Sequence, residues 1–244
     1  MTTITLRKPK LYFSKINEIA SFVVEPTNEV LNNLSTKDKI KEIVALYLIK
    51  ILIGAFLILI FEVIFNINNS AAQDFSEKYH PLIVLFLGGV LTPLIEEATF
   101  RLSIIFKPIF LSISIGLLTL IIYSKSLDTG VLRIDDTIYL RYSISLIVGI
   151  LTYYVALKNI TLIQNFWSNH FRWIFYFSAI VFGFAHFGNF DLDFNNLYLI
   201  PLLTLPHIIG GIFFGYVRIK HGFRYAFGFH SLNNMIALSL ALLI

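Results

Sequence analysis

Long apolar runs alternate with short polar segments along most of the chain. A transmembrane α-helix needs about 20 predominantly apolar residues, and seven runs reach or approach this length. Pro108 separates the second run from the third, because the residue before a proline disfavours helical backbone. The pattern predicts an all-α fold, a polytopic transmembrane helical bundle of about seven spans. These spans are expected near residues 41–65, 81–106, 108–124, 138–158, 172–189, 196–217 and 224–244.

A different pattern precedes the first apolar run. Between residues 11 and 24 the apolar positions recur at helical spacing, with polar residues on the other side, which predicts an amphipathic helix that ends before Pro26. Two interpretations are open: this helix rests in the membrane interface, or it packs on the protein's own cytoplasmic face. Residues 35–38 read Ser-Thr-Lys-Asp, a capping box that opens the next helix. We therefore divide the chain into a basic cytoplasmic segment, 1–40, and a transmembrane domain, 41–244.

Composition supports a membrane protein. The 244 residues are 57% hydrophobic and 14% charged, whereas soluble domains carry about 25% charged residues. The net charge of +4 does not indicate nucleic-acid binding, because the cationic residues flank the apolar runs, as the positive-inside rule describes. Their distribution predicts a cytoplasmic N-terminus and a C-terminus outside. Cysteine is absent from the sequence, which excludes disulfides, thiolate catalysis and thiolate metal ligands.

Two carboxylates and a guanidinium lie near the end of the second predicted span, at Glu96, Glu97 and Arg101. A charge in the hydrocarbon region costs roughly 2.5–3.5 kcal/mol on insertion scales, so it persists only if it is paired, hydrated or used. Glu97 and Arg101 are four residues apart and share one helical face, which favours an ion pair. Glu96 points about 100° away from Glu97 and has no local partner.

Other predicted spans carry further polar residues. Phe182 and His186 lie in the fifth span, and His230 and Asn234 lie in the seventh, four residues apart on one helix face. Counting along each helix puts Glu96 and His230 in the inner half of the bilayer and His186 nearer its middle. Polar groups in lipid should converge, because each alone would be unsatisfied. A single His or Asn can equally be a hydrogen-bonded packing residue between helices, and this alternative stays open.

The ordered motifs Glu96-Glu97-x-x-x-Arg101, Phe182-x-x-x-His186 and His230-x-x-x-Asn234 resemble those of the CPBP family of intramembrane proteases. That family includes the CAAX prenyl endoproteases of the Rce1 type and the bacterial Abi proteins. All three motifs are present without substitution between residues 93 and 234. Residues 1–80 carry no family signature, and His207 lies outside the motifs.

The resemblance implies roles for the four polar residues of these motifs. Glu96 and His186 would activate a water that attacks a peptide carbonyl. His230 and Asn234 would donate hydrogen bonds to the oxyanion of the tetrahedral intermediate. Spacing alone leaves open whether Glu96 or Glu97 is the base, and the family pattern favours Glu96.

The resemblance also implies supporting residues and a choice about metal. Glu97 and Arg101 would hold the second span in register, and Phe182 would pack beneath the cavity. The preferred mechanism requires no cofactor. The alternative is a zinc site, for which Glu96, His186 and His230 would supply a His₂Glu ligand set with a water in the fourth position. Against zinc, the sequence has no His-Glu-x-x-His pair, and the family it resembles works without an obligatory metal.

The expected activity is therefore that of an intramembrane endopeptidase embedded in a lipid bilayer. Its substrate would be a membrane-associated protein or peptide, such as a CAAX-type C-terminus or a bacteriocin-related precursor. One alternative is a non-catalytic immunity or scaffold protein of the same fold, which the intact motifs disfavour. Another is a transporter, which usually shows broken helices paired between two halves, and the sequence shows no such pairing.

Overall fold

The computed structural model describes residues 9–28, 34–65, 79–190 and 194–243. These ranges contain helices and no strand, which confirms the predicted all-α class. In order, the helices are α1 (Pro9–Val24), α2 (Thr36–Phe65), α4 (Pro81–Phe86), η1 (Leu87–Leu91), α5 (Thr92–Phe100), η2 (Leu102–Ile104), α6 (Pro108–Ser126), α7 (Ile138–Lys158), α8 (Ile160–Asn169), α9 (Phe171–Phe184), η3 (Phe187–Asn189), η4 (Phe194–Leu199), α10 (Ile200–Leu203), α11 (Leu205–His221) and α12 (Phe223–Ala241).

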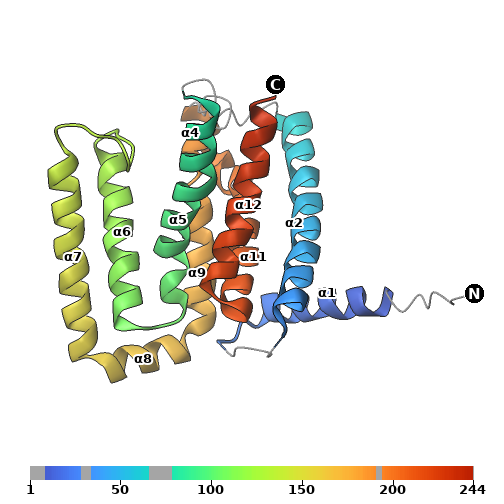
Figure 1. The fold of residues 1–244 in the computed structure, drawn as a ribbon, viewed down its shortest axis with the longest axis horizontal. Helices are drawn as coiled ribbons and strands as arrows, with labels where there is room; N and C mark the ends of the chain where they lie inside the picture. Colours follow the sequence, from blue (N-terminus) through green and yellow to red (C-terminus); the bar gives the residue numbers. More distant parts are fainter. Residues whose placement is uncertain (1–8, 29–33, 66–78, 191–193, 244) are drawn as a thin grey trace, which may run out of the picture.

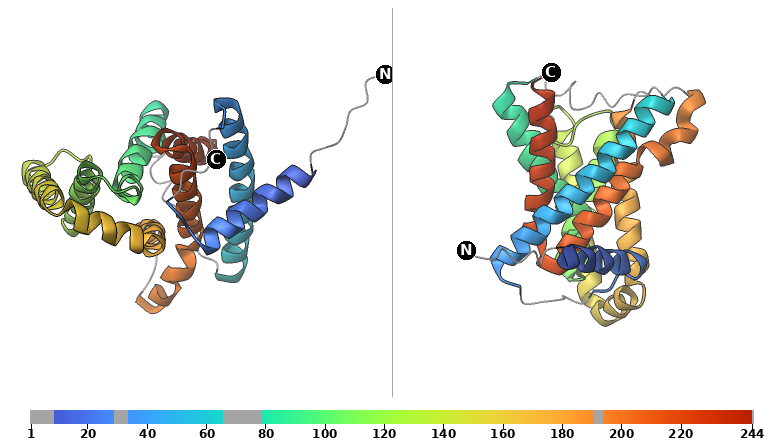
Figure 2. Two further views of the ribbon diagram at one scale, coloured as in Figure 1. Left: turned by 90° about the horizontal axis from the view of Figure 1, so that it is seen from below. Right: turned by 90° about the vertical axis from the view of Figure 1, so that its right-hand side faces the viewer.

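The long helices lie side by side and form one bundle, in which α2 is inclined to α12 (Figure 1, Figure 2). α1 and α8 run across one end of this bundle, nearly perpendicular to the long helices (Figure 1, Figure 2). α12 ends at the opposite end, beside the start of α4 (Figure 1). Helices satisfy their own backbone hydrogen bonds, so an aligned bundle is one of the few architectures that can cross a bilayer.

Within the described residues, five helical segments are long and apolar enough to cross a membrane. They match five of the predicted spans to within a few residues, and they are Pro81–Ile104, Pro108–Ser126, Ile138–Lys158, Phe171–Asn189 and Leu197–His221. The runs at 41–65 and 224–244 fold as α2 and α12 but are not among the five, so the predicted count of seven is not confirmed. In α12 the polar residues His230, Asn233 and Asn234 lower the mean hydropathy.

A capping interaction fixes the start of α2, as the sequence predicts. Ser35 Oγ accepts a hydrogen bond from the Asp38 backbone N–H at 3.2 Å and donates one to Asp38 Oδ2 at 2.7 Å. The first N–H groups of a helix have no partner within the helix, so this contact stabilises its first turn.

A π-helical turn, η1, joins α4 to α5 and creates acceptors for α12. Ser231 Oγ donates a hydrogen bond to the Gly89 carbonyl, and Asn234 Nδ2 donates one to the Gly88 carbonyl at 3.3 Å. A Cβ atom at Gly89 would lie 2.8 Å from Met235 Cγ, so the close approach of α12 depends on glycine at this position. π-Helical turns within helices often occur at functional sites.

α9 and α11 cross at very short range. A Cβ atom at Gly183 would lie 2.2 Å from the Ile208 side chain and 2.9 Å from its backbone nitrogen. On α11, a Cβ at Gly211 would lie 3.1 Å from the backbone of Ala179 of α9. Aromatic side chains fill the surrounding core, and they include Phe100, Phe182, Phe213, Phe214 and Phe229.

His186 does not lie within a helix, because α9 ends at Phe184 and the chain then turns. The sequence count placed His186 nearer the membrane middle than Glu96, and the packing of α9 removes this difference. Ser178 Oγ donates a hydrogen bond to the Phe100 carbonyl, so this part of α9 is level with the end of α5. The two helices run in opposite directions, so the residues that follow Ser178 approach the level of Glu96, one turn before Phe100.

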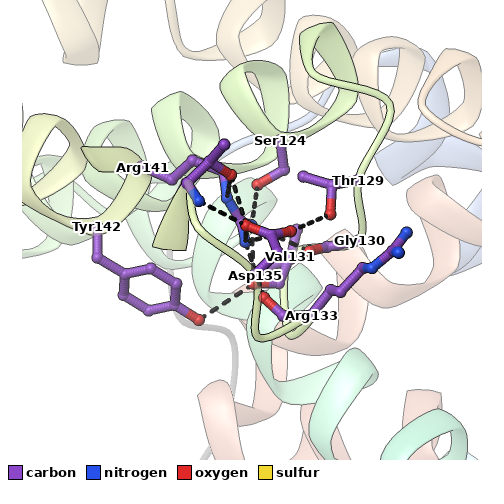
Figure 3. A network of polar contacts seen from close by, with 9 residues as sticks. Ser124, Thr129, Gly130, Val131, Arg133, Asp135, Arg141 and Tyr142 are labelled. Atoms are coloured by element: carbon purple, nitrogen blue, oxygen red, sulfur yellow. Dashed lines mark hydrogen bonds and ion pairs between the residues drawn. The ribbon is translucent and has the colours of Figure 1, made fainter. Parts of the chain in front are cut away.

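The segment between α6 and α7 closes around the guanidinium of Arg141 (Figure 3). Arg141 is fully buried and donates hydrogen bonds to the carbonyls of Gly130 at 3.0 Å and Arg133 at 2.8 Å. It also donates to Ser124 Oγ at 3.0 Å and pairs with Asp135 at 3.2 Å. Arg141 therefore acts as a structural residue of this hairpin.

Asp135 is stabilised in its ionised form by the same network. Hydrogen bonds from Thr129 and Thr137, together with the Arg141 guanidinium, hold the pKa of Asp135 well below its ordinary value. The segment 127–137 lies outside the candidate spans, so this charge pair is accessible to changes in bulk pH.

α1 packs against the bundle through its second half. The Phe22 ring lies 5.3 Å from the Phe175 ring and 5.0 Å from the Tyr216 ring, between centroids. Lys220 on α11 pairs with Glu18 of α1 and, at 2.6 Å, with Glu42 of α2. Of the two interpretations from sequence, contact with the protein itself is therefore observed, whereas the amphipathic character predicted for residues 11–24 is not confirmed.

Candidate active site

The carboxylate of Glu96, on α5, faces imidazoles from two other parts of the chain. Glu96 Oε1 lies 3.7 Å from His186 Nε2, and Glu96 Oε2 lies 3.4 Å from His230 Nε2. The side chains of Glu96 and His186 are each 18% exposed, whereas that of His230 is 3% exposed. Glu96 therefore lies at the edge of a buried polar cluster, with part of its side chain exposed and its Oε2 atom buried.

Glu97 lies behind this carboxylate and contacts two cationic or polar partners. Its Oε1 atom lies 3.6 Å from Arg101 Nη1 and 3.0 Å from His230 Nδ1, and both Glu97 and Arg101 are completely buried. The Arg101 Cζ atom lies 3.6 Å from the Phe182 ring centroid, a cation–π contact that supports the guanidinium on its other side. The expected contact of Glu97 with Arg101 is present, and Glu97 also orients the His230 ring.

His186 is held by three neighbouring groups. Its Nδ1 atom lies 2.8 Å from the Phe182 carbonyl oxygen, and its ring stacks on His207 with 4.4 Å between centroids. The preceding carbonyl, of Ala185, accepts a hydrogen bond from Lys125 Nζ of α6 at 2.6 Å. A carbonyl only accepts hydrogen bonds, so the contact with Phe182 assigns a proton to Nδ1 and leaves Nε2 facing Glu96.

Asn234 lies one turn after His230 on α12 and contacts a different set of groups. Its Nδ2 donates to the Gly88 carbonyl at 3.3 Å, and its Oδ1 accepts from Asn233 Nδ2 at 3.2 Å. Lys50 Nζ of α2 in turn donates to Asn233 Oδ1 at 2.6 Å. Glu96, His186 and His230 therefore meet in this structure, whereas Asn234 is joined to none of them by a hydrogen bond in the described part of the chain.

The zinc alternative concerns the same three side chains as the preferred mechanism. Across residues 9–28, 34–65, 79–190 and 194–243, no group of three or more His, Cys, Asp or Glu side chains is arranged to hold a metal ion. The set considered for zinc, Glu96, His186 and His230, is in contact only pairwise through the carboxylate. The preferred mechanism uses only side chains of the protein, and the effect of a zinc chelator on cleavage distinguishes it from the zinc alternative.

A family model described as type II CAAX prenyl endopeptidase Rce1-like matches residues 78–236, which is more than half of the chain. The chain belongs to the Rce1-like family. Searches of curated proteins and of solved structures gave no match. Membership of the Rce1-like family and the five apolar helices together show that the chain is an integral membrane protein of an endopeptidase family.

The Rce1-like match contains every motif residue singled out in the sequence, from Glu96 to Asn234. It excludes α1 and most of the segment that precedes α4, including the whole of α2. Lys50 therefore reaches the site from a helix outside the matched residues.

Three residues near the site were not predicted to act there. His207 is outside the motifs, and the only signal in the sequence is a single imidazole on an apolar helix. Lys125 and Lys50 are single lysines at the end of an apolar run and within one, and such lysines commonly extend to the membrane surface. Each of these side chains suits several environments, so only the packing of the helices shows that they contact His186, Ala185 and Asn233.

Proposed function

We propose that this Rce1-like protein is an intramembrane endopeptidase that hydrolyses a peptide bond of a membrane-associated protein or peptide. The supporting observation is the position of the Glu96 carboxylate between the Nε2 atoms of His186 and His230, at 3.7 and 3.4 Å. A carboxylate in a span is costly unless it is paired, hydrated or used, and this one combines imidazole neighbours with partial exposure. That combination suits activation of a water in contact with a substrate carbonyl.

In the proposed reaction, Glu96 and His186 bind the nucleophilic water. The His186 ring is neutral in this reaction, so its Nε2 atom, which faces Glu96, is an acceptor. Glu96 Oε2 makes no hydrogen bond within the described residues and also has acceptor capacity. The water oxygen attacks the scissile carbonyl carbon while Glu96 takes a proton from the water. Glu96 then returns this proton to the leaving amine as the carbon–nitrogen bond breaks, which leaves the enzyme unchanged.

His230 and Asn234 are the proposed donors to the oxyanion of the tetrahedral intermediate. Because Glu97 accepts from His230 Nδ1, an N–H at Nε2 as well requires the doubly protonated ring. The local charges then balance, since the carboxylates of Glu96 and Glu97 face the cations of Arg101 and His230. Asn234 has a second amide hydrogen, because only one is engaged by a backbone carbonyl.

The proposed substrate class follows from the family and the location of the site. A CAAX-type C-terminus or a membrane-anchored peptide precursor would reach the exposed side of Glu96 from the bilayer or its surface. A helical substrate must unwind locally before hydrolysis, because its backbone groups are already paired. We place the N-terminus in the cytoplasm from the distribution of Lys and Arg, and the preferred mechanism requires no cofactor.

The test is cleavage of a farnesylated CAAX peptide, with a fluorophore and a quencher on either side of the scissile bond, by purified protein in lipid nanodiscs. Glu96→Gln and His186→Ala are each expected to lower kcat by about 10²–10⁴-fold, the usual effect of losing a general acid or base. Glu25→Gln, which changes an exposed carboxylate of the same charge, is the matched control and should cleave like the wild type.

Each other outcome has a distinct meaning. Full activity of Glu96→Gln would overturn its assignment as the base. Activity lost with a chelator and restored by zinc would replace the proposed mechanism with a metal-dependent one. Peptide binding without cleavage by the wild type, and unchanged in Glu96→Gln, would support the scaffold alternative instead.

A further inference from the structure

Lys50 of α2 reaches the candidate site from outside the family match. Its Nζ atom donates a hydrogen bond to Asn233 Oδ1 at 2.6 Å and lies 5.5 Å from the centroid of the Phe214 ring, which stacks on His230. The Lys50 side chain also passes Gly210 of α11, where a Cβ would lie 3.4 Å from Lys50 Cε, an ordinary contact distance. Lys50 therefore sits beside the proposed oxyanion donors without contacting Glu96.

The contacts of Lys50 fix the orientation of two amides. A lysine ammonium only donates hydrogen bonds, so Asn233 must present its oxygen to Lys50 and its Nδ2 to the other side. Asn233 Nδ2 then donates to Asn234 Oδ1 at 3.2 Å, which requires Asn234 to present its own Nδ2 away from Asn233. The oxygen and nitrogen of each side-chain amide can otherwise exchange places by rotation, and only such a network determines which atom faces which partner.

We propose that Lys50 is a positioning residue that sets the donor orientation of Asn234 through Asn233. This inference rests on the proposed function, in which Asn234 Nδ2 stabilises the oxyanion. Two contacts in the described part of the chain hold the Asn234 amide in this orientation, its donation to the Gly88 carbonyl and its acceptance from Asn233. Without the ammonium, the Asn233 amide can reverse and place its oxygen against Asn234 Oδ1, so that only the contact with Gly88 still favours the donor orientation of Asn234. The charge of Lys50 also polarises the two amides in the direction that strengthens the final donor.

The kinetic test uses the farnesylated fluorogenic peptide in nanodiscs. Lys50→Met is expected to lower kcat about tenfold, part of the 10²–10³ that loss of an oxyanion donor costs, with KM changed less than about twofold. Lys50→Arg, which keeps a pure donor, should recover most of the rate. Lys158→Met, at an exposed lysine at the end of α7, is the matched control and should leave kcat unchanged.

Coupling separates positioning from a general structural role. If Lys50 acts through Asn234, the double variant Lys50→Met/Asn234→Ala should be no slower than Asn234→Ala alone. Multiplicative effects, or a loss that appears in KM rather than kcat, would overturn the inference. So would a wild-type rate in Lys50→Met.

A spectroscopic measurement keeps the inference separate from the proposed activity. In protein with ¹⁵N-labelled asparagine, the side-chain amide resonances of Asn234, assigned with Asn234→Asp, should shift in Lys50→Met and return in Lys50→Arg. If the wild type fails to cleave the peptide but these shifts appear, the proposed function fails for this substrate and the positioning role of Lys50 is still supported. Unshifted Asn234 amide resonances in Lys50→Met overturn the positioning role of Lys50, whatever the activity.

Discussion

The Glu97→Gln substitution should destabilise the protein strongly, because it breaks a completely buried ion pair. Glu97 Oε1 lies 3.6 Å from Arg101 Nη1, and neither side chain is exposed. No guanidinium nitrogen of Arg101 has a hydrogen-bond partner in the described part of the chain, so the carboxylate supplies its main electrostatic partner. Glutamine keeps the shape and can still accept a hydrogen bond from His230, but it leaves the guanidinium charge uncompensated.

Removing one partner of a buried pair costs about 3–5 kcal/mol, because the other charge remains buried alone. The cation–π contact of Arg101 with Phe182 is present before and after the change and therefore does not offset the loss. We expect a destabilisation near the lower end, about 3 kcal/mol, since the hydrogen bond to His230 can be kept. For a domain of this size, that corresponds to a decrease in Tm of roughly 6–12 °C.

The assay is thermal unfolding in detergent, followed by the fluorescence of the two tryptophans, Trp167 and Trp173. The double variant Glu97→Gln/Arg101→Met removes the unpaired charge as well, and it should be more stable than Glu97→Gln by about 2 kcal/mol. Glu25→Gln, at an exposed position, should unfold like the wild type. A Tm for Glu97→Gln within about 2 °C of the wild type would refute the reasoning. So would a double variant that is less stable than both Glu97→Gln and Arg101→Met alone.

The remaining predictions concern packing, the position of one imidazole and pH. Gly183→Ala should lower the Tm and abolish cleavage, because its methyl group would lie 2.2 Å from a side chain of α11, whereas Gly54→Ala, with no atom within 4 Å, should be tolerated. Lys125→Met should lower kcat several-fold by releasing the turn that carries His186, with the peptide assay as readout. The lowered pKa of Asp135 means that its stabilisation is present above pH ~4 and is lost only as the pH falls further, so Asp135→Asn should lower the Tm at neutral pH and remove this acid dependence.

Much of the fold follows from the sequence because the bilayer imposes simple requirements. The length of a span dictates apolar runs, and five of those predicted are found as candidate spans. The start of α2 was predicted from the side chains of Ser35 and Asp38, whose interaction is local. The π-helical turn at η1 was not predicted, because it depends on how closely α12 approaches Gly89. α8 was not predicted either, since it is a short helix across the end of the bundle.

In the candidate site, too, some contacts could be predicted from the sequence and others depend on how distant helices pack. The convergence of Glu96 with His186 and His230 was predicted from the need to satisfy polar groups in lipid. The contact of Glu97 with His230 was not, because i,i+4 spacing identifies only the partner on the same helix. Lys50 could not be placed beside Asn233 from sequence, since the two are 183 residues apart and the packing of α2 on the bundle decides their distance.

The places where regular α-helix stops explain why the polar groups gather where they do. In lipid an unsatisfied backbone group costs several kcal/mol, so each break in a helix needs side-chain donors nearby. Ser231 and Asn234 donate hydrogen bonds to backbone carbonyls of the π-helical turn. Lys125 and His186 contact the backbone carbonyls at the end of α9. The residues that satisfy these breaks are thus partly the residues proposed for catalysis. It follows that site and fold cannot be varied independently here, and that variants at Asn234 or His186 need unfolding measurements beside every rate.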